Sequence, residues 1–135
     1  MEEEANWRCG IAVFAAGNEY AGNPAFPGAY SKCVSVASLA ADYTPACYTD
    51  FGSLVTLSAP GGDLEYYGKI GETEDEYWAE TGEQKGAVLS TLVKNGQPAY
   101  GYMEGTSMAC PHVSGVAALG LASVFALTGK TRSKL

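Results

Sequence analysis

The stretch from Gly105 to Leu127 constrains the fold more than any other part of this 135-residue chain. It begins with the motif GTSMACPHVSG and continues with an apolar run from Val116 to Leu127. Gly105 lets the entering loop turn tightly, and Thr106 is suited to cap a helix that begins beside it. Because the run is apolar on nearly every side, we expect the helix to be buried between a sheet and neighbouring helices.

Ser107 lies at this loop-to-helix junction, between small residues. The amino end of a helix offers partial positive charge and free N–H groups to an oxyanion that forms beside it. A serine in this place is therefore a candidate nucleophile. The motif closely resembles the catalytic-serine segment of the subtilases, the subtilisin-like serine peptidases.

A second segment, IAVFAAGN at residues 11–18, reads as a short buried strand and is similar to another subtilase segment. In subtilases this strand end supplies the oxyanion-hole amide and one wall of the pocket for the substrate side chain before the cut bond. The resemblance implies that Asn18 donates to the oxyanion, which would stabilise the tetrahedral intermediate. It also implies the following substrate-binding residues: Ala15, Ala16, Gly17, Ala25, Phe26, Gly105 and Thr106.

Four shorter segments follow in the family's order and are also similar to subtilase segments: FPGAY at 26–30, the strand CVSVAS at 33–38, YTDFG at 48–52 and LSAPG at 57–61. The resemblance covers about residues 7–62 and 86–127, and it implies a three-layer α/β fold with a mainly parallel sheet. Residues 1–135 would form an incomplete half, the C-terminal part of one catalytic domain. It also implies a cis peptide at Phe26-Pro27, which costs only about 0.5–1 kcal/mol before proline.

The other two members of a subtilase triad are not evident. Such triads run Asp, His, Ser along the chain, and the similar region begins after the first two should have appeared. The one histidine, His112, lies five positions after Ser107, about 140° around the helix, so we expect it to be structural. The resemblance implies a serine endopeptidase whose Asp and His come from a missing N-terminal half of the same domain. Without a base the serine is a weak nucleophile, so this chain alone should be almost inactive.

Two other functions remain open. A non-catalytic remnant of a subtilase that binds peptides or regulates another protein would also lack the base. A different serine hydrolase is disfavoured because GTSMA lacks the second glycine of the usual nucleophile elbow. The small residues at positions 15–17 leave room for a sizeable side chain of a peptide or protein substrate, and the resemblance to subtilases implies that this side chain is large and apolar.

Acidic residues are concentrated in one insertion, at about residues 63–85. The net charge is −7, and eight of the 15 acidic residues fall between positions 63 and 83. This disfavours nucleic-acid binding, which requires a basic surface. Calcium would suit such carboxylates, but the spacing matches no recognised calcium loop. We therefore expect no required cofactor or metal, with calcium as the alternative.

The four cysteines, at positions 9, 33, 47 and 110, lack the spacing of a zinc site. We expect free, buried thiols, with a Cys33–Cys47 disulfide as the alternative. The acidic N-terminus lacks the pattern of a signal peptide, so we expect none in this chain, although full-length subtilases are typically secreted. The apolar run ending at Leu127 is shorter than the roughly 20 residues of a membrane span, so we expect a soluble protein.

The segment before the serine motif predicts a β-hairpin. Residues 88–92 read as a strand that returns to the core, Asn95-Gly96 as a tight turn, and residues 98–102 as an edge strand. This hairpin would deliver the chain to the serine loop.

Overall fold

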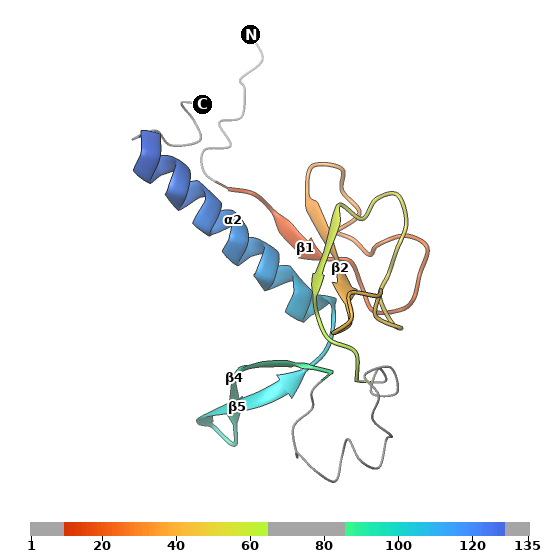
Figure 1. The fold of residues 1–135 in the computed structure, drawn as a ribbon. Coiled ribbons are helices and arrows are strands. Elements are labelled where there is room, and N and C mark those ends of the chain that lie inside the picture. Colours follow the sequence, from red (N-terminus) through yellow and green to blue (C-terminus); the bar gives the residue numbers. More distant parts are fainter. Residues whose placement is uncertain (1–9, 65–85, 129–135) are drawn as a thin grey trace.

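The computed structural model describes residues 10–64 and 86–128. A three-stranded parallel sheet has one long helix against it, and a two-stranded hairpin stands apart from both (Figure 1). The elements are β1 (Val13–Ala15), β2 (Val34–Leu39), β3 (Leu57–Pro60), β4 (Val88–Lys94), β5 (Gln97–Met103) and α2 (Thr106–Thr128). The expected α/β class is confirmed.

The parallel sheet has the order β1-β2-β3, with Val13 beside Val34 and Val36 beside Leu57. The helix α2 contacts all three strands. Ala109 of α2 is fully buried against Val36 of β2, because a methyl group lets the helix approach the strands closely. The described core is therefore small, and it lies between the first turns of α2 and the sheet.

The predicted strand at 33–38 is confirmed, since β2 is buried on both faces as a central parallel strand should be. The strand expected within residues 11–18 is shorter and ends at Ala15. Gly17 has a φ of 126°, which an extended strand cannot contain. The chain therefore turns out of the sheet just before Asn18.

The burial expected for the apolar helix is wrong for its second half. Val116 and Leu119 are 70% and 71% exposed. The reason is geometric: α2 continues well past the end of the sheet (Figure 1), so only its first turns have strands to pack against. Within residues 10–64 and 86–128, Thr106–Leu127 also has the length and apolar composition of a membrane span, a test that core helices of soluble proteins pass too.

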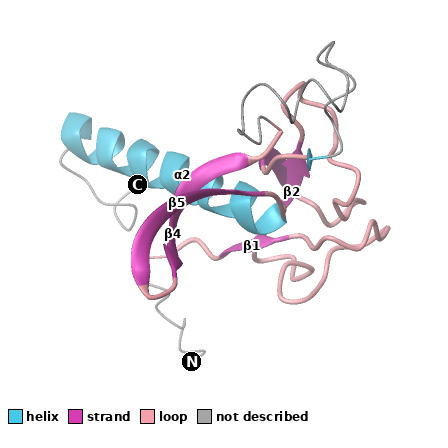
Figure 2. Ribbon diagram, turned by 90° about the horizontal axis from the view of Figure 1, so that it is seen from below, coloured by secondary structure: helices cyan, strands magenta, loops and turns pink. Residues whose placement is uncertain are grey.

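The predicted hairpin is confirmed: β4 and β5 pair antiparallel through the turn Asn95-Gly96. Both turn residues have positive φ, 54° and 74°, as a two-residue hairpin turn of this kind requires. The expectation that residues 88–92 return to the core is wrong. Among the described residues β4 pairs with β5 alone and is largely exposed, so the two strands form a separate arm (Figure 2).

The residues at the two ends of the acidic insertion lie side by side, because the Asp63 N–H donates to the Gly86 carbonyl (2.8 Å). Asp63 itself is buried and accepts a hydrogen bond from the Cys47 N–H (2.8 Å). This first acidic residue of the insertion is therefore packed against the loop that follows β2. The alternative of a calcium site falls on residues 65–85, which lie outside the described residues.

The disulfide alternative is wrong, because Cys33 and Cys47 are both thiols, as is Cys110. The Cys47 thiol donates to the Asp63 carboxylate instead (3.6 Å). The expected burial is also wrong for Cys47, which is exposed, whereas the other two are half-buried. Burial raises the pKa of the Cys110 thiol. Cys9 lies outside the described residues.

Candidate active site

The candidate site lies where the carboxyl ends of the parallel strands meet the amino end of α2. Gly17 and Asn18 follow β1, and Gly61 follows β3. The Gly105 N–H donates to the Gly61 carbonyl (3.0 Å), which ties the start of the helix to the sheet edge. In open α/β sheets ligands bind outside this edge, so the predicted residues gather where a site is expected.

Asn18 and Thr106 lie 88 positions apart in the sequence but are joined by two hydrogen bonds. The Thr106 N–H and its hydroxyl both donate to Asn18 Oδ1, at 2.9 and 2.8 Å. The same hydroxyl accepts from the Gly17 N–H (3.3 Å). Because Oδ1 is held by two donors, the orientation of the amide is set, and its Nδ2 group remains to donate elsewhere.

This arrangement corrects the expectation that Thr106 caps the helix. Thr106 is the first helical residue, and its hydroxyl is engaged with Asn18 rather than with the N–H groups of its own turn. The Gly105 carbonyl instead accepts from the Met108 N–H (2.9 Å). Gly105 has a φ of 143°, a conformation that L side chains rarely adopt.

Ser107 is the second residue of α2 and its side chain is exposed. It directly follows the residue that holds Asn18, so the structure brings the two predicted catalytic residues to the same end of the helix. A Cβ atom at Gly105 would lie 3.5 Å from Asn18 Nδ2, which shows how close the amide is to the loop before the serine. Their catalytic roles remain predictions.

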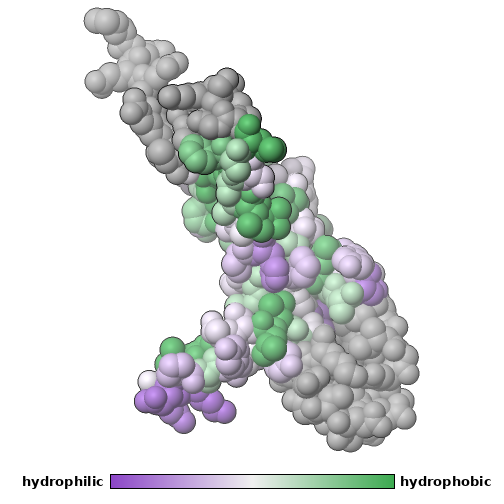
Figure 3. All heavy atoms as spheres, turned by 60° about the vertical axis from the view of Figure 1, so that its left-hand side comes forward, coloured by the Kyte–Doolittle hydropathy of each residue, from purple (hydrophilic) through white to green (hydrophobic). Residues whose placement is uncertain are grey.

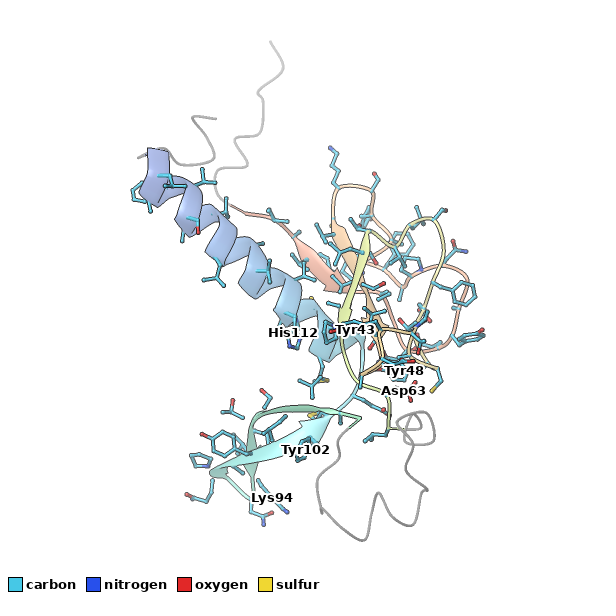
Figure 4. All side chains as sticks on the ribbon, viewed as in Figure 1. Tyr43, Tyr48, Asp63, Lys94, Tyr102 and His112 are labelled. Atoms are coloured by element: carbon cyan, nitrogen blue, oxygen red, sulfur yellow. The ribbon has the colours of Figure 1, made fainter. Side chains whose placement is uncertain are left out.

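His112 is held by its own helix. One ring nitrogen, Nδ1, lies 2.8 Å from the Met108 carbonyl, one turn earlier, and the ring is exposed (Figure 4). This contact is the one expected of a histidine with a structural role.

The residues predicted to form the pocket wall lie beside the end of β1. The Ala25 N–H donates to the Ala16 carbonyl (2.7 Å), so the loop that follows Asn18 folds back beside the strand end. A Cβ atom at Gly28 would lie 3.0 Å from the Ala15 carbonyl, a contact tighter than most Cβ atoms make. The predicted cis peptide at Phe26-Pro27 is confirmed. The Phe26 ring is 73% exposed, and it packs edge-on against Tyr30.

A cavity of about 200 Å³ opens beside Asn18 and is lined also by Tyr48, Glu104 and Gly105. The Tyr48 hydroxyl donates to the Gly62 carbonyl and bonds the Ser38 hydroxyl (2.8 Å). Burial, and to a smaller extent the negative charge of Glu104, raises the pKa of Tyr48 to about 12.

Neither Tyr48 nor Glu104 was expected at the site. Glu104 could have been predicted at the site, because it directly precedes Gly105 in the sequence. In the structure, the Leu64 N–H donates to the Glu104 carboxylate across a separation of 40 positions. Tyr48 begins the segment YTDFG, which resembles a subtilase segment, but its place beside Glu104 could not be predicted because it depends on how two distant loops pack.

Comparison with protein families gives a match between residues 2–132 and the model described as the subtilase family. Halolysin from Haloferax mediterranei is 37% identical over 112 residues, covering 83% of this chain and 17% of halolysin. A halolysin-like extracellular serine protease from Natrialba magadii is 30% identical over 113 residues, covering 84% of this chain and 16% of that protein.

Among solved structures, a protease from Pseudoalteromonas arctica superposes with a TM-score of 0.63 and 36% identity, covering 81% of this chain and 29% of that chain. The chain thus spans less than a third of each of these three proteins.

Proposed function

Because this chain belongs to the subtilase family, we propose that it forms the serine-bearing part of an endopeptidase that cleaves peptide or protein substrates through an acyl-enzyme. The observation that carries the proposal is the pair of hydrogen bonds from Thr106 to Asn18. They orient a side-chain amide beside an exposed serine at the amino end of a helix. That is the arrangement an oxyanion hole requires.

In the proposed reaction, the Ser107 hydroxyl attacks the substrate carbonyl carbon, and the carbonyl oxygen becomes an oxyanion. The Asn18 Nδ2–H and the Ser107 backbone N–H donate to that oxygen, and the helix dipole adds favourable charge. A histidine must take the hydroxyl proton and later give it to the leaving amine, held in the right tautomer by an aspartate. We assign both to an N-terminal portion of the same domain, called here the completing portion.

The exposed apolar surface of α2 supports a completing portion. Figure 3 shows apolar side chains gathered along the helix, in a patch of the kind that marks an interaction surface. The exposed large apolar side chains of this half of the helix are Val116, Leu119, Leu121, Phe125 and Leu127, and they lie on more than one side of it. In the described residues β1 is also an edge strand of the parallel sheet, and an edge strand presents backbone groups to which a further strand can pair.

Substrate binding is assigned to both sides of the oxyanion site. Ala15, Ala16 and Gly17, with Ala25 and Phe26, would form the wall beside the residue before the cut bond. Gly105 and Thr106 would line the approach to Ser107. Small side chains leave space for a large apolar residue of the substrate. The proposal needs no cofactor or metal, and it involves neither nucleic acid nor a membrane.

The related halolysin-like protease is extracellular by name, and we propose secretion for the complete protein.

The test is peptide hydrolysis by a completed domain. The portion of the Pseudoalteromonas arctica protease that precedes the matched region would be joined to this chain, since the family's chain order places Asp and His there. Hydrolysis should appear and be abolished by Ser107→Ala. Asn18→Ala should lower kcat by roughly 10²–10³, the cost of losing such a donor in subtilisin, a member of this family.

Ser114→Ala is the matched control, because Ser114 also lies on α2 but its hydroxyl bonds the Cys110 carbonyl within the helix. This variant should keep wild-type kcat. Binding of a peptide without cleavage, in a completed domain that is folded, would instead favour the non-catalytic remnant. That alternative is supported by the one histidine of this chain being occupied within its own helix.

A further inference from the structure

Asp50 is a buried acid that the proposed reaction does not use. It is 1% exposed and lies between the sheet and the loop that carries Asn18. Its Oδ1 accepts hydrogen bonds from the backbone N–H groups of Glu19 (3.0 Å) and Ala21 (2.8 Å). A buried carboxylate is costly unless hydrogen bonds compensate it, and here the compensating donors come from the residues that immediately follow Asn18.

The main chain around Asp50 runs beside the same loop. The Asp50 N–H donates to the Gly17 carbonyl (3.0 Å), and the Phe51 N–H donates to the Ala21 carbonyl (2.9 Å). The neighbouring Thr49 hydroxyl accepts from the Ser38 N–H (2.8 Å) at the end of β2. A continuous path of hydrogen bonds therefore connects the sheet, through residues 49–51, to the loop at 17–21.

Gly17 shows how tightly Asp50 fits against the loop. A Cβ atom at Gly17 would overlap Asp50 Oδ2, and Gly17 has a φ of 126°. On its other side Gly17 donates its N–H to Thr106. The backbone that enters Asn18 is thus held between the carboxylate of Asp50 and the first residue of α2.

We propose that Asp50 is a positioning residue that fixes the Asn18 amide for the oxyanion, an inference that rests on the function proposed above. It acts through the N–H groups of Glu19 and Ala21, so what it must supply is an acceptor oxygen at the position of Oδ1. Asp50→Asn keeps that acceptor and should preserve the loop. Asp50→Ala removes it, leaves two N–H groups without their partner, and lets Asn18 move.

The test is a double-mutant cycle on the completed domain, with kcat and KM measured separately. An oxyanion donor acts in the transition state, so Asp50→Ala should lower kcat by roughly 10–100-fold with little change in KM. In the Asn18→Ala background the same substitution should have almost no further effect. Asp50→Asn, which keeps the acceptor oxygen, should have a kcat within about threefold of the wild-type value.

Asp42→Ala is the matched control, since Asp42 also accepts two bonds, from the Thr44 N–H and hydroxyl, in a turn outside the Asn18 loop. It should leave kcat within about twofold of wild type. If Asp50→Ala does not fold, Asp50→Ser replaces it, because a hydroxyl keeps one oxygen but cannot reach both amides.

An equal loss of kcat from the Asp50 substitution in the wild-type and Asn18→Ala backgrounds would overturn the positioning role, since it would show that Asp50 acts independently of the amide. Unchanged kcat in Asn18→Ala alone is a different result. It would overturn the proposed function of Asn18 and leave Asp50 with no site to position.

Discussion

At the scale of single residues, the site depends on one amide being held from two directions. Thr106 fixes Asn18 Oδ1, and the backbone on either side of Asn18 is bonded to Thr106 and Asp50. An amide with free rotation would present oxygen as often as nitrogen to the substrate. Two donors on one oxygen remove that ambiguity, because an oxygen accepts and the Nδ2 group can only donate.

Thr106→Val tests this hold on the amide. The substitution keeps the backbone N–H bond to Asn18 but removes the hydroxyl that donates to Oδ1 and accepts from Gly17. Losing one such bond costs about 1 kcal/mol, which corresponds to roughly fivefold in a rate, so kcat of the completed domain should fall by about that factor, with KM nearly unchanged. Thr44→Val, at an exposed turn, is the control. A drop in substrate affinity at constant kcat would contradict the assignment.

Tyr48 gives the folded protein a dependence on alkaline pH. Its pKa is raised from the ordinary value of 10.0 to about 12 when the chain is folded. Between these values the unfolded chain loses the proton first, so the free energy of unfolding should fall as the pH rises through this range. Because the residue is only half-buried, the loss should be about 1 kcal/mol rather than the full value.

Denaturant unfolding of wild type and Tyr48→Phe, at about pH 9 and about pH 12, measures this effect on either side of the titration. The variant should be less stable at the lower pH, because the bond to the Gly62 carbonyl is lost. The difference between the two proteins should shrink at the higher pH. A difference that stays constant across this range would show that Tyr48 titrates normally.

At the scale of elements, close backbone contacts join the sheet edge to the helix. A Cβ atom at Gly61 would overlap Ser38 Oγ and would lie 2.6 Å from the Gly105 carbonyl. The Gly61 carbonyl also accepts the Gly105 N–H. The end of β3 therefore determines where the serine loop begins.

Gly61→Ala should displace the Gly105 backbone and lower the free energy of unfolding by about 1–3 kcal/mol, as overpacking does. Gly96→Ala is the matched control, because Gly96 has a φ of 74° but nothing within 4 Å of an added Cβ. It should cost about 1 kcal/mol of local strain. Both would be compared by thermal unfolding and by kcat of the completed domain, and an equal effect of the two on kcat would contradict the coupling.

The sequence predicts the local elements better than their environment. The central strand at 33–38 and the turn Asn95-Gly96 depend on short patterns, and the cis peptide at Phe26-Pro27 is implied by the resemblance to subtilases; all three are present. The burial of the second half of α2 and the return of β4 to the core depend on which other elements pack against them. Both expectations are wrong. Asp50 was part of a recognised segment, but only the packed loops reveal its two backbone partners.

At the scale of the whole molecule, the described residues expose apolar surface, and its exposure to water is unfavourable in free energy. The second half of α2 alone contributes five large side chains, each at least 45% exposed: Val116, Leu119, Leu121, Phe125 and Leu127. The same chain spans less than a third of the curated relatives described above. Both observations support the completing portion, which would cover the helix and supply the base for Ser107 at once.

The rate at which a fluorophosphonate labels Ser107 tests the central claim most directly, because the reagent reports only an activated serine. The chain alone should label no faster than its Ser107→Ala variant, since its one histidine is engaged within its own helix and a hydroxyl without a base is a weak nucleophile. Joining the completing portion should raise the rate by at least about 10³-fold, and Ser107→Ala should abolish the gain. Rapid labelling of Ser107 in the chain alone, or no gain in a folded completed domain, would contradict the account.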